Sequence, residues 1–254
     1  MQMVLTFVLW FILIMLGVHV GYALIMVSIF FFAASGGWNL VPFALEQMFN
    51  GVNSQTLLAV PFFVLAGNLM NGGGVTTRIF DFAASMIGHR KGGLAHVNVV
   101  ASLIFSGMSG SALADAGGLG QLEIKSMKDA GFDEGFAGGI TAASCIIGPL
   151  VPPSTPLIIY AVLANQSVEK LFMAGFLPGL LTTAALMIMC SILSHKRNYP
   201  SEPKRSWSYR ANSFKKSFWA LLTPVIILIG IFTGYFTPTE AAVVAALYTM
   251  ILGF

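Results

Sequence analysis

Two stretches interrupt long apolar segments with glycine or proline. Residues 106–120 read SGMSGSALADAGGLG, and residues 146–160 read IIGPLVPPSTPLIIY. In a bilayer, irregular backbone is stable only where it is buried in protein or lines a water-filled cavity. Two such breaks close together in a membrane sequence point to an ion or substrate site. The pattern therefore predicts a helical membrane protein that moves a solute.

Composition supports a membrane protein and excludes several other classes. The chain is 56% hydrophobic and 9% charged, against roughly 25% charged residues in soluble proteins. We therefore expect an all-α polytopic protein with the lipid bilayer as its environment and no nucleic acid partner. No G-x-x-x-x-G-K-[ST] loop is present, which argues against ATP-driven pumping. An enzyme is not expected, because no histidine lies near the serines of the first break in the predicted topology.

The apolar runs predict the order of the spans. Residues 3–34 would form a helix of about 48 Å, which exceeds a hydrocarbon core of about 30 Å, so the Gly-containing break at 17–21 divides them into two short spans. The other expected segments are an interfacial helix in 36–54, spans at 56–70, 171–194, 217–234 and 241–253, and an amphipathic helix at 78–88.

The two interrupted stretches predict non-spanning elements. Both arms of 92–129 are short and rich in small residues, which favours a re-entrant hairpin with both ends on one side of the membrane. Residues 135–164 contain Pro152, Pro153 and Pro156, and a proline within a helix removes a backbone hydrogen bond and clashes one turn back. This segment is therefore expected to be two half-helices joined by an extended link.

Charge predicts the orientation. If the basic loop 195–216 is cytoplasmic, twelve of the thirteen lysines and arginines lie inside, and only Lys170 lies outside. This agreement requires the 92–129 segment to be a hairpin or to cross twice. The N-terminus is then periplasmic. A cleaved signal peptide is not expected, because the first basic residue is Arg78.

The end of the chain resembles its beginning. Residues 11–32 and 227–251 each contain an apolar run, a Gly-containing break and a second apolar run. Five crossings separate them, so the second copy is inverted, as in many secondary transporters. The expected divisions are 1–90, 91–194, the cytoplasmic loop at 195–216, and an incomplete second repeat at 217–254.

Four polar residues are further candidates. Asp115 is an intramembrane carboxylate, which is a functional candidate by default, and it could tune an ion site or form a hydrogen bond within the hairpin. Thr155 and Asn68 are candidate contacts to the substrate or to the hairpin. Glu240 follows Thr237 by three residues at a helix start, and we interpret it as a cap.

Three motifs, FSGMSGSALADAGGLG, IIGPLVPPSTPLIIYAV and FTPTEAAVVAALY, resemble the large (M-type, DctM-like) membrane subunit of TRAP transporters, the tripartite ATP-independent periplasmic transporters. The resemblance covers the whole chain in order. It implies an elevator-type secondary transporter that imports an organic acid by sodium symport across a bacterial or archaeal inner membrane. The resemblance implies scaffold and arm helices for residues 1–90 and half of a transport domain for residues 91–194. It also implies two partners, a periplasmic substrate-binding protein and a small four-helix membrane subunit.

The resemblance also implies a Na⁺ site between the hairpin tip and the broken helix. The matching positions are Ser109 and Ser111 at the tip, and Gly148, Val151 and Pro153 in the break. Oxygen ligands suit a hard cation, and unwound backbone supplies them without a buried charge. The alternative from the residues alone is that the two serines are N-caps of the returning half-helix.

The chain departs from the family pattern in one respect. Large TRAP subunits carry two repeats, whereas this chain stops soon after the second begins, which suggests a fragment, a truncated product or half of a split subunit. Two alternatives remain open at this point. One is a sodium–dicarboxylate elevator symporter that needs no binding protein, and the other is a membrane assembly module without transport.

Overall fold

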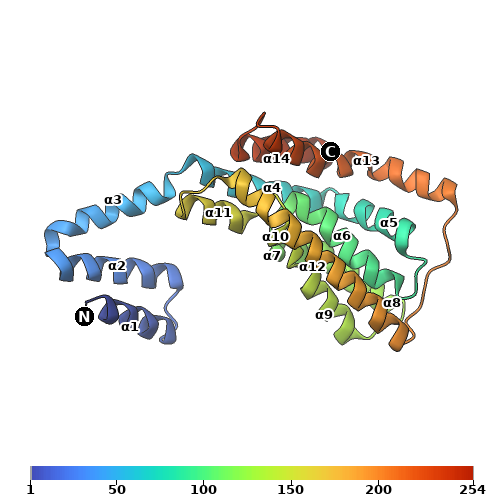
Figure 1. Ribbon diagram of the computed structural model, residues 1–254, viewed down its shortest axis with the longest axis horizontal. Helices are drawn as coiled ribbons and strands as arrows, with labels where there is room; N and C mark the ends of the chain where they lie inside the picture. Colours follow the sequence, from blue (N-terminus) through green and yellow to red (C-terminus); the bar gives the residue numbers. More distant parts are fainter. Residues whose placement is uncertain (1, 254) are drawn as a thin grey trace. The chain divides into compact units, whose positions relative to one another are not determined.

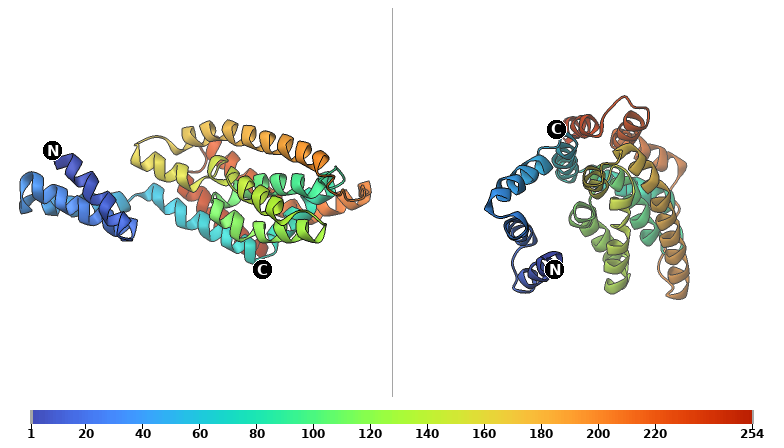
Figure 2. Two further views of the ribbon diagram at one scale, coloured as in Figure 1. Left: turned by 90° about the horizontal axis from the view of Figure 1, so that it is seen from below. Right: turned by 60° about the vertical axis from the view of Figure 1, so that its left-hand side comes forward.

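A computed structural model describes residues 2–253, which are helical with no β-strand (Figures 1 and 2). The chain divides into two compact units, one up to Ser54 and the other from Gln55 onward. The elements are α1 (Gln2–Met15), α2 (Val20–Gly36), η1 (Trp38–Leu40), α3 (Val41–Val52), η2 (Gln55–Leu58), α4 (Ala59–Gly72), α5 (Val75–Ile87), α6 (Gly93–Ser109), α7 (Ala112–Gly117), α8 (Leu119–Asp129), α9 (Glu134–Ser144), α10 (Ile147–Leu150), α11 (Thr155–Leu163), α12 (Val168–Lys196), α13 (Trp207–Phe232) and α14 (Pro238–Gly253).

The first unit contains α1, α2, η1 and α3. The expected break near residue 17 is confirmed, because α1 ends at Met15 and α2 begins at Val20. The side-chain amide of Gln2 donates a hydrogen bond to the Ala34 carbonyl oxygen (3.0 Å), so the start of α1 lies beside the end of α2 and the two helices are antiparallel. The helix expected within 36–54 is present as η1 and α3.

In the second unit, the 92–129 segment folds back on itself as expected. Its two open ends meet one loop: the Gly92 amide donates to the Pro200 carbonyl oxygen (3.0 Å), and the Phe132 ring stacks on Tyr199 with centroids 4.5 Å apart. Both ends of the hairpin therefore lie on the same side of this unit. The returning arm differs from the expectation in one detail, because it is split into α7 and α8 at Gly118.

The broken helix is also confirmed. α9 and α10 lead into an extended link at 151–154, and α11 leaves at an angle of 42°. Val151 and Ser154 have extended dihedral angles, and the two prolines lie between them. A further interruption, between Ser144 and Ile147, separates α9 from α10 and was not expected from the sequence.

Two helices within residues 2–253, α12 and α13, are long and apolar enough to cross a membrane, and the number rises to four if each of two bent helix pairs is one span. α12 runs along α6, the first arm of the hairpin (Figure 1). The loop expected at 195–216 is shorter than predicted. α12 continues to Lys196, and α13 begins at Trp207, where the Ser206 hydroxyl accepts a hydrogen bond from the Tyr209 amide (3.2 Å). Polar composition alone does not end a helix, and the Ser206 N-cap starts one within the polar stretch.

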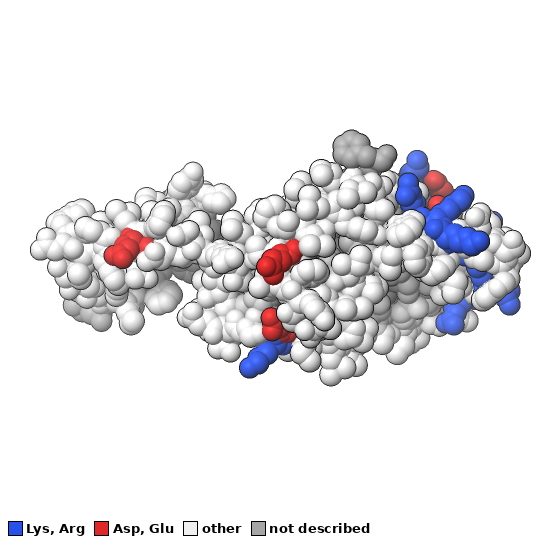
Figure 3. Space-filling view, turned by 90° about the horizontal axis from the view of Figure 1, so that it is seen from above, with Lys and Arg blue, Asp and Glu red and all other residues white. Residues whose placement is uncertain are grey.

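Basic residues gather at one end of the second unit (Figure 3). At this end, the loop between α5 and α6 is hydrogen-bonded to the loop between α12 and α13. Lys91 Nζ donates to Asn198 Oδ1 (2.7 Å), and the Glu202 amide donates to the Gly88 carbonyl oxygen (3.1 Å). A shared basic end is what the charge rule requires of cytoplasmic loops. The side of the membrane on which this end lies stays a prediction.

Candidate functional site

The hairpin tip is a tight turn between α6 and α7. Gly110 has a φ of 59°, a left-handed conformation that glycine adopts at little cost. The Ser111 hydroxyl accepts a hydrogen bond from the Ala114 amide (3.4 Å) and caps α7. Ser109 does not cap a helix, because its hydroxyl donates instead to Asp115 Oδ1. The N-cap interpretation therefore holds for Ser111 alone, and Asp115 forms a hydrogen bond within the hairpin.

Prolines free the carbonyl groups of the facing break. In a helix, each carbonyl oxygen accepts from the amide four residues later, but Pro152, Pro153 and Pro156 have no N–H. The carbonyl oxygens of Gly148, Pro149 and Pro152 therefore lack their helical donors. Pro149 O is satisfied by the Ser154 hydroxyl (2.6 Å). The Gly148 carbonyl lies in the short helix α10 and the Pro152 carbonyl lies in the extended link that follows.

The tip and the break are in direct contact. The Thr155 amide donates to the Gly110 carbonyl oxygen (3.1 Å), which joins the start of α11 to the turn. A Cβ atom added to Gly148 would lie 2.8 Å from Asp115 Oδ2 and 3.4 Å from the backbone of Ser111. A Cβ atom added to Gly110 would overlap the Pro153 carbonyl oxygen. The structure thus brings the two interrupted stretches together so closely that Gly110 and Gly148 have no room for a side chain.

The remaining candidates differ in their positions. Val151 is buried (3% exposed) and packs against Gly179 of α12. Thr155 lies at the contact with the tip, and its hydroxyl is buried without a hydrogen-bond partner. Asn68 is exposed on α4, and its neighbour Gly67 is the α4 residue that packs against Ser109. A contact of Asn68 with the substrate or the hairpin stays a prediction.

A buried polar cluster continues from the tip along the interior of the hairpin. Asn98 of α6 donates to the Thr141 hydroxyl (2.7 Å) and accepts from the Ser144 hydroxyl (2.7 Å), and both of these residues lie on α9. The Ser102 hydroxyl donates to the Ser144 oxygen (3.1 Å). Glu123 of α8 lies against this cluster with its side chain fully buried.

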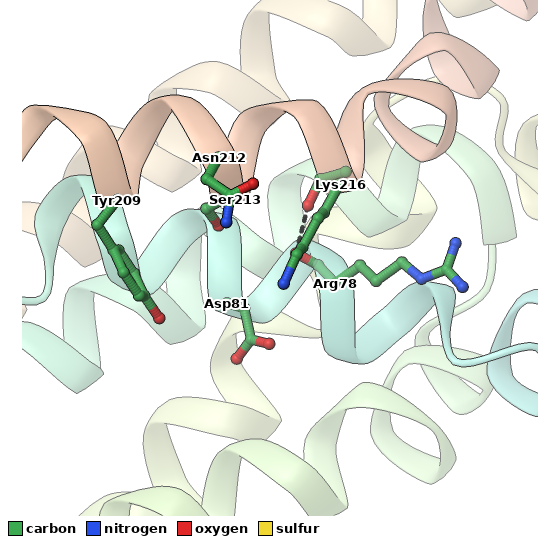
Figure 4. Close-up of a pocket in the computed structure, with 7 residues that line it drawn as sticks. Arg78, Asp81, Tyr209, Asn212, Ser213 and Lys216 are labelled. Atoms are coloured by element: carbon green, nitrogen blue, oxygen red, sulfur yellow. Dashed lines mark hydrogen bonds between the residues drawn. The ribbon is translucent and has the colours of Figure 1, made fainter.

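A second polar site is a pocket of about 90 Å³ between α5 and α13 (Figure 4). The Lys216 ammonium lies on the same side as Asp81, whereas the Arg78 guanidinium points away from that carboxylate. The Ser217 hydroxyl donates to the Arg78 carbonyl oxygen (2.7 Å) and ties the two helices together. Burial raises the pKa of Asp81 above its ordinary value, and the nearby Lys216 partly offsets this effect.

The sequence reasoning missed Glu123, Asn71 and Thr223. Asn71 of α4 lies against Gly118, at the point where the returning arm splits. Thr223 is buried on α13 with its hydroxyl unpaired, beside Pro224, which packs against Gly107 of the hairpin. The positions of Glu123 and Asn71 result from tertiary packing and have no local signal. Pro224, a proline within α13, was a usable pointer to Thr223.

A helical hairpin packed on a proline-broken helix, among helices that are apolar enough to cross a membrane, places the chain in the class of helical membrane proteins. Comparison with known proteins then identifies its family. The family model described as "Tripartite ATP-independent periplasmic transporter, DctM component" matches residues 7–254. The chain belongs to this family, the large membrane subunits of TRAP transporters.

Curated relatives agree with this assignment. The chain is 57% identical, over 96% of its length, to the sialic acid TRAP transporter permease protein SiaT of Haemophilus influenzae and to the large permease protein SiaM of Vibrio cholerae. It is 42% identical, over 80% of its length, to the C4-dicarboxylate TRAP transporter large permease protein DctM of Pseudomonas aeruginosa. The matched regions cover 39%, 57% and 48% of these three relatives, so the chain spans about half the length of the proteins that it resembles. All three are permeases and not enzymes.

Proposed function

We propose that the chain forms part of a sodium-coupled TRAP permease that imports an organic acid through the bacterial inner membrane. The observation that carries this proposal is the contact between the hairpin tip and the proline-broken helix. There, hydroxyl groups of Ser109 and Ser111 lie beside a backbone segment whose carbonyl oxygens have lost their helical donors. Hydroxyl and carbonyl oxygens are suitable ligands for a hard monovalent cation and need no formal charge of their own.

In this proposal, Na⁺ is held by the two serines of the tip and by the backbone at Gly148, Val151 and Pro153. Asp115 positions Ser109 through their hydrogen bond and supplies negative charge near the cation. Thr155 joins the break to the tip through its backbone amide. Cation binding would therefore favour the conformation in which the hairpin is closed on the broken helix.

The proposed substrate is a sialic acid or a related carboxylate. The sialic acid permeases share 57% identity with the chain, whereas the C4-dicarboxylate permeases of Pseudomonas aeruginosa and Vibrio cholerae share 42% and 38%. By analogy with the tripartite systems that these names describe, the partners would be a periplasmic substrate-binding protein and a small membrane subunit. Movement as an elevator is part of the same proposal, supported by the two similar helix–break–helix motifs, α1–α2 and α13–α14.

Uptake by the intact permease in proteoliposomes tests the proposal. We expect labelled sialic acid to enter only with its binding protein and an inward sodium gradient. A Ser109→Ala, Ser111→Ala double variant should need about tenfold more sodium for half-maximal uptake, which corresponds to about 1.4 kcal/mol of lost binding energy.

Ser106→Ala is the matched control, because Ser106 is a buried serine of α6 that bonds only within its helix, to the Leu103 carbonyl oxygen (2.7 Å). Its sodium dependence should equal that of the unmodified protein. If the double variant also keeps the original sodium dependence, the tip is not the ion site. Uptake that proceeds without a binding protein would contradict the tripartite mechanism.

A further inference from the structure

Glu123 is a buried carboxylic residue, and the Ser102 hydroxyl is the polar group that the structure places against it. Its side chain is 0% exposed, and neither Oε1 nor Oε2 has a hydrogen-bond partner. It projects from α8 into the interior of the hairpin, where the Ser102 hydroxyl of α6 faces it. An ionised carboxylate in such surroundings is strongly destabilising unless it is paired and hydrogen-bonded.

The groups around Glu123 supply no positive charge. From α6 it meets the Ser102 hydroxyl, which in turn donates to Ser144 of α9. The titratable groups that face it are Asp115 of α7 and Cys145, which follows α9. Asp115 is itself buried with Oδ2 unpaired, so a second negative charge there would add repulsion.

The basic side chains on the neighbouring helices α5, α6 and α8 do not pair with Glu123. Lys125 and Lys128 of α8 are exposed, and Lys128 pairs with Glu134 (2.7 Å). His96, the buried histidine of α6, has its ring nitrogen at the Gly92 carbonyl oxygen (3.2 Å), at the open end of the hairpin. On α5, which also packs on α8, Arg78 is exposed and lines the pocket shared with α13.

In these buried surroundings, a neutral carboxylic acid is more stable than a carboxylate. It carries no charge into the protein interior, and its single O–H needs one acceptor, which the Ser102 oxygen can provide. Ser102 keeps its own donor bond to Ser144 in this arrangement, because a hydroxyl oxygen accepts while its hydrogen donates.

We propose that Glu123 is a proton-binding site of the hairpin, separate from the proposed sodium site, and that its carboxyl group carries a proton in the folded protein. The proton comes from water as the hairpin packs against α9, and it forms the O–H bond of the acid. Release would require α8 to separate from α9 and admit water. The hairpin could then exchange a proton with solvent each time it opens.

Infrared difference spectroscopy on the intact permease in lipid nanodiscs tests the protonation state directly. We expect a carboxylic-acid C=O band near neutral pH in the unmodified protein. This band should lose intensity in Glu123→Gln. Glu169→Gln is the matched control, since Glu169 is exposed at the start of α12, and the band should persist in that variant. A spectrum without any acid band, or one that Glu123→Gln leaves unchanged, overturns the proposal.

Thermal unfolding across pH gives an independent readout. The unfolded chain releases this proton near about pH 4.3, whereas the folded protein retains it, so rising pH favours the unfolded state of the unmodified protein. Glutamine has no proton to lose. The ratio of folded to unfolded protein should therefore rise in Glu123→Gln relative to the unmodified protein, by up to about tenfold for each pH unit above about pH 5.

The same measurement distinguishes a bound proton from a bound metal. Glu169→Gln should follow the pH dependence of the unmodified protein. If the advantage of Glu123→Gln is constant across pH, or changes with sodium concentration and not with pH, Glu123 is not a proton site. Because this readout needs no substrate, it is independent of whether sialic acid uptake is observed.

Discussion

Replacing Gly110 with alanine probes the contact on which the site depends. Two costs apply at this position. The left-handed backbone (φ of 59°) costs an L-residue about 1–2 kcal/mol. The new Cβ atom would also overlap the Pro153 carbonyl oxygen and would lie 3.3 Å from Ser154 Cα. Overpacking of this kind costs about 1–3 kcal/mol, so we expect a total loss of about 2–5 kcal/mol.

Gly131→Ala separates the two costs. Gly131 is also left-handed (φ of 87°), and it lies in the turn between α8 and α9, where an added Cβ atom would meet nothing within 4 Å. This variant should lose only the backbone cost of about 1–2 kcal/mol. The difference between the two variants then measures how closely the tip approaches the broken helix.

Chemical denaturation of the intact permease in detergent, with and without sodium, provides the assay. We expect Gly110→Ala to unfold more readily than Gly131→Ala and to lose most of the stabilisation that sodium gives, because the displaced Pro153 carbonyl is a proposed ligand. Gly131→Ala should keep that stabilisation. Equal losses in the two variants would show that the hairpin tip does not pack on the break.

Two further predictions concern the link and the orientation. Ser154→Ala should cost about 1–3 kcal/mol of stability, measured by the same denaturation, because it removes both the donor to Pro149 O and the N-cap of α11; a cost within error of zero would contradict this geometry. Cysteines introduced at Lys128 and Lys204 should react with an impermeant thiol reagent only from the cytoplasmic side, and labelling of either from the periplasm would reverse the proposed orientation.

The interruptions of the fold were predictable because their causes are local. Pro152 and Pro153 remove amide hydrogens wherever the chain goes, so the break in the broken helix follows from the sequence itself. The expected cap at the start of α14 is confirmed for the same reason: the Glu240 carboxylate accepts from the Thr237 amide (2.8 Å), and the Glu240 amide donates to the Thr237 hydroxyl (3.3 Å). Both features involve residues within one helical turn.

Features that depend on packing between helices were harder to predict. Glu123 lies in a helix with several charged residues, and nothing in that pattern distinguishes it from the exposed Lys125. Asn68 and Asn71 are one turn apart on α4, and only the approach of the returning arm decides that Asn71 lies against Gly118. The early start of α13 was missed because the mostly polar stretch 207–216 was assumed to form a loop.

The carbonyl oxygens left without donors by the proline run have a practical consequence for mutagenesis. A peptide oxygen has no proton to release in water and is present in every residue type, so neither acidity nor an ordinary side-chain exchange can remove it. Replacing a proline would instead restore an amide hydrogen and cover the oxygen four positions earlier. Alanine at Pro152 would therefore test the Gly148 ligand only indirectly, by restoring a helical hydrogen bond, and backbone ester substitution would be the more direct approach.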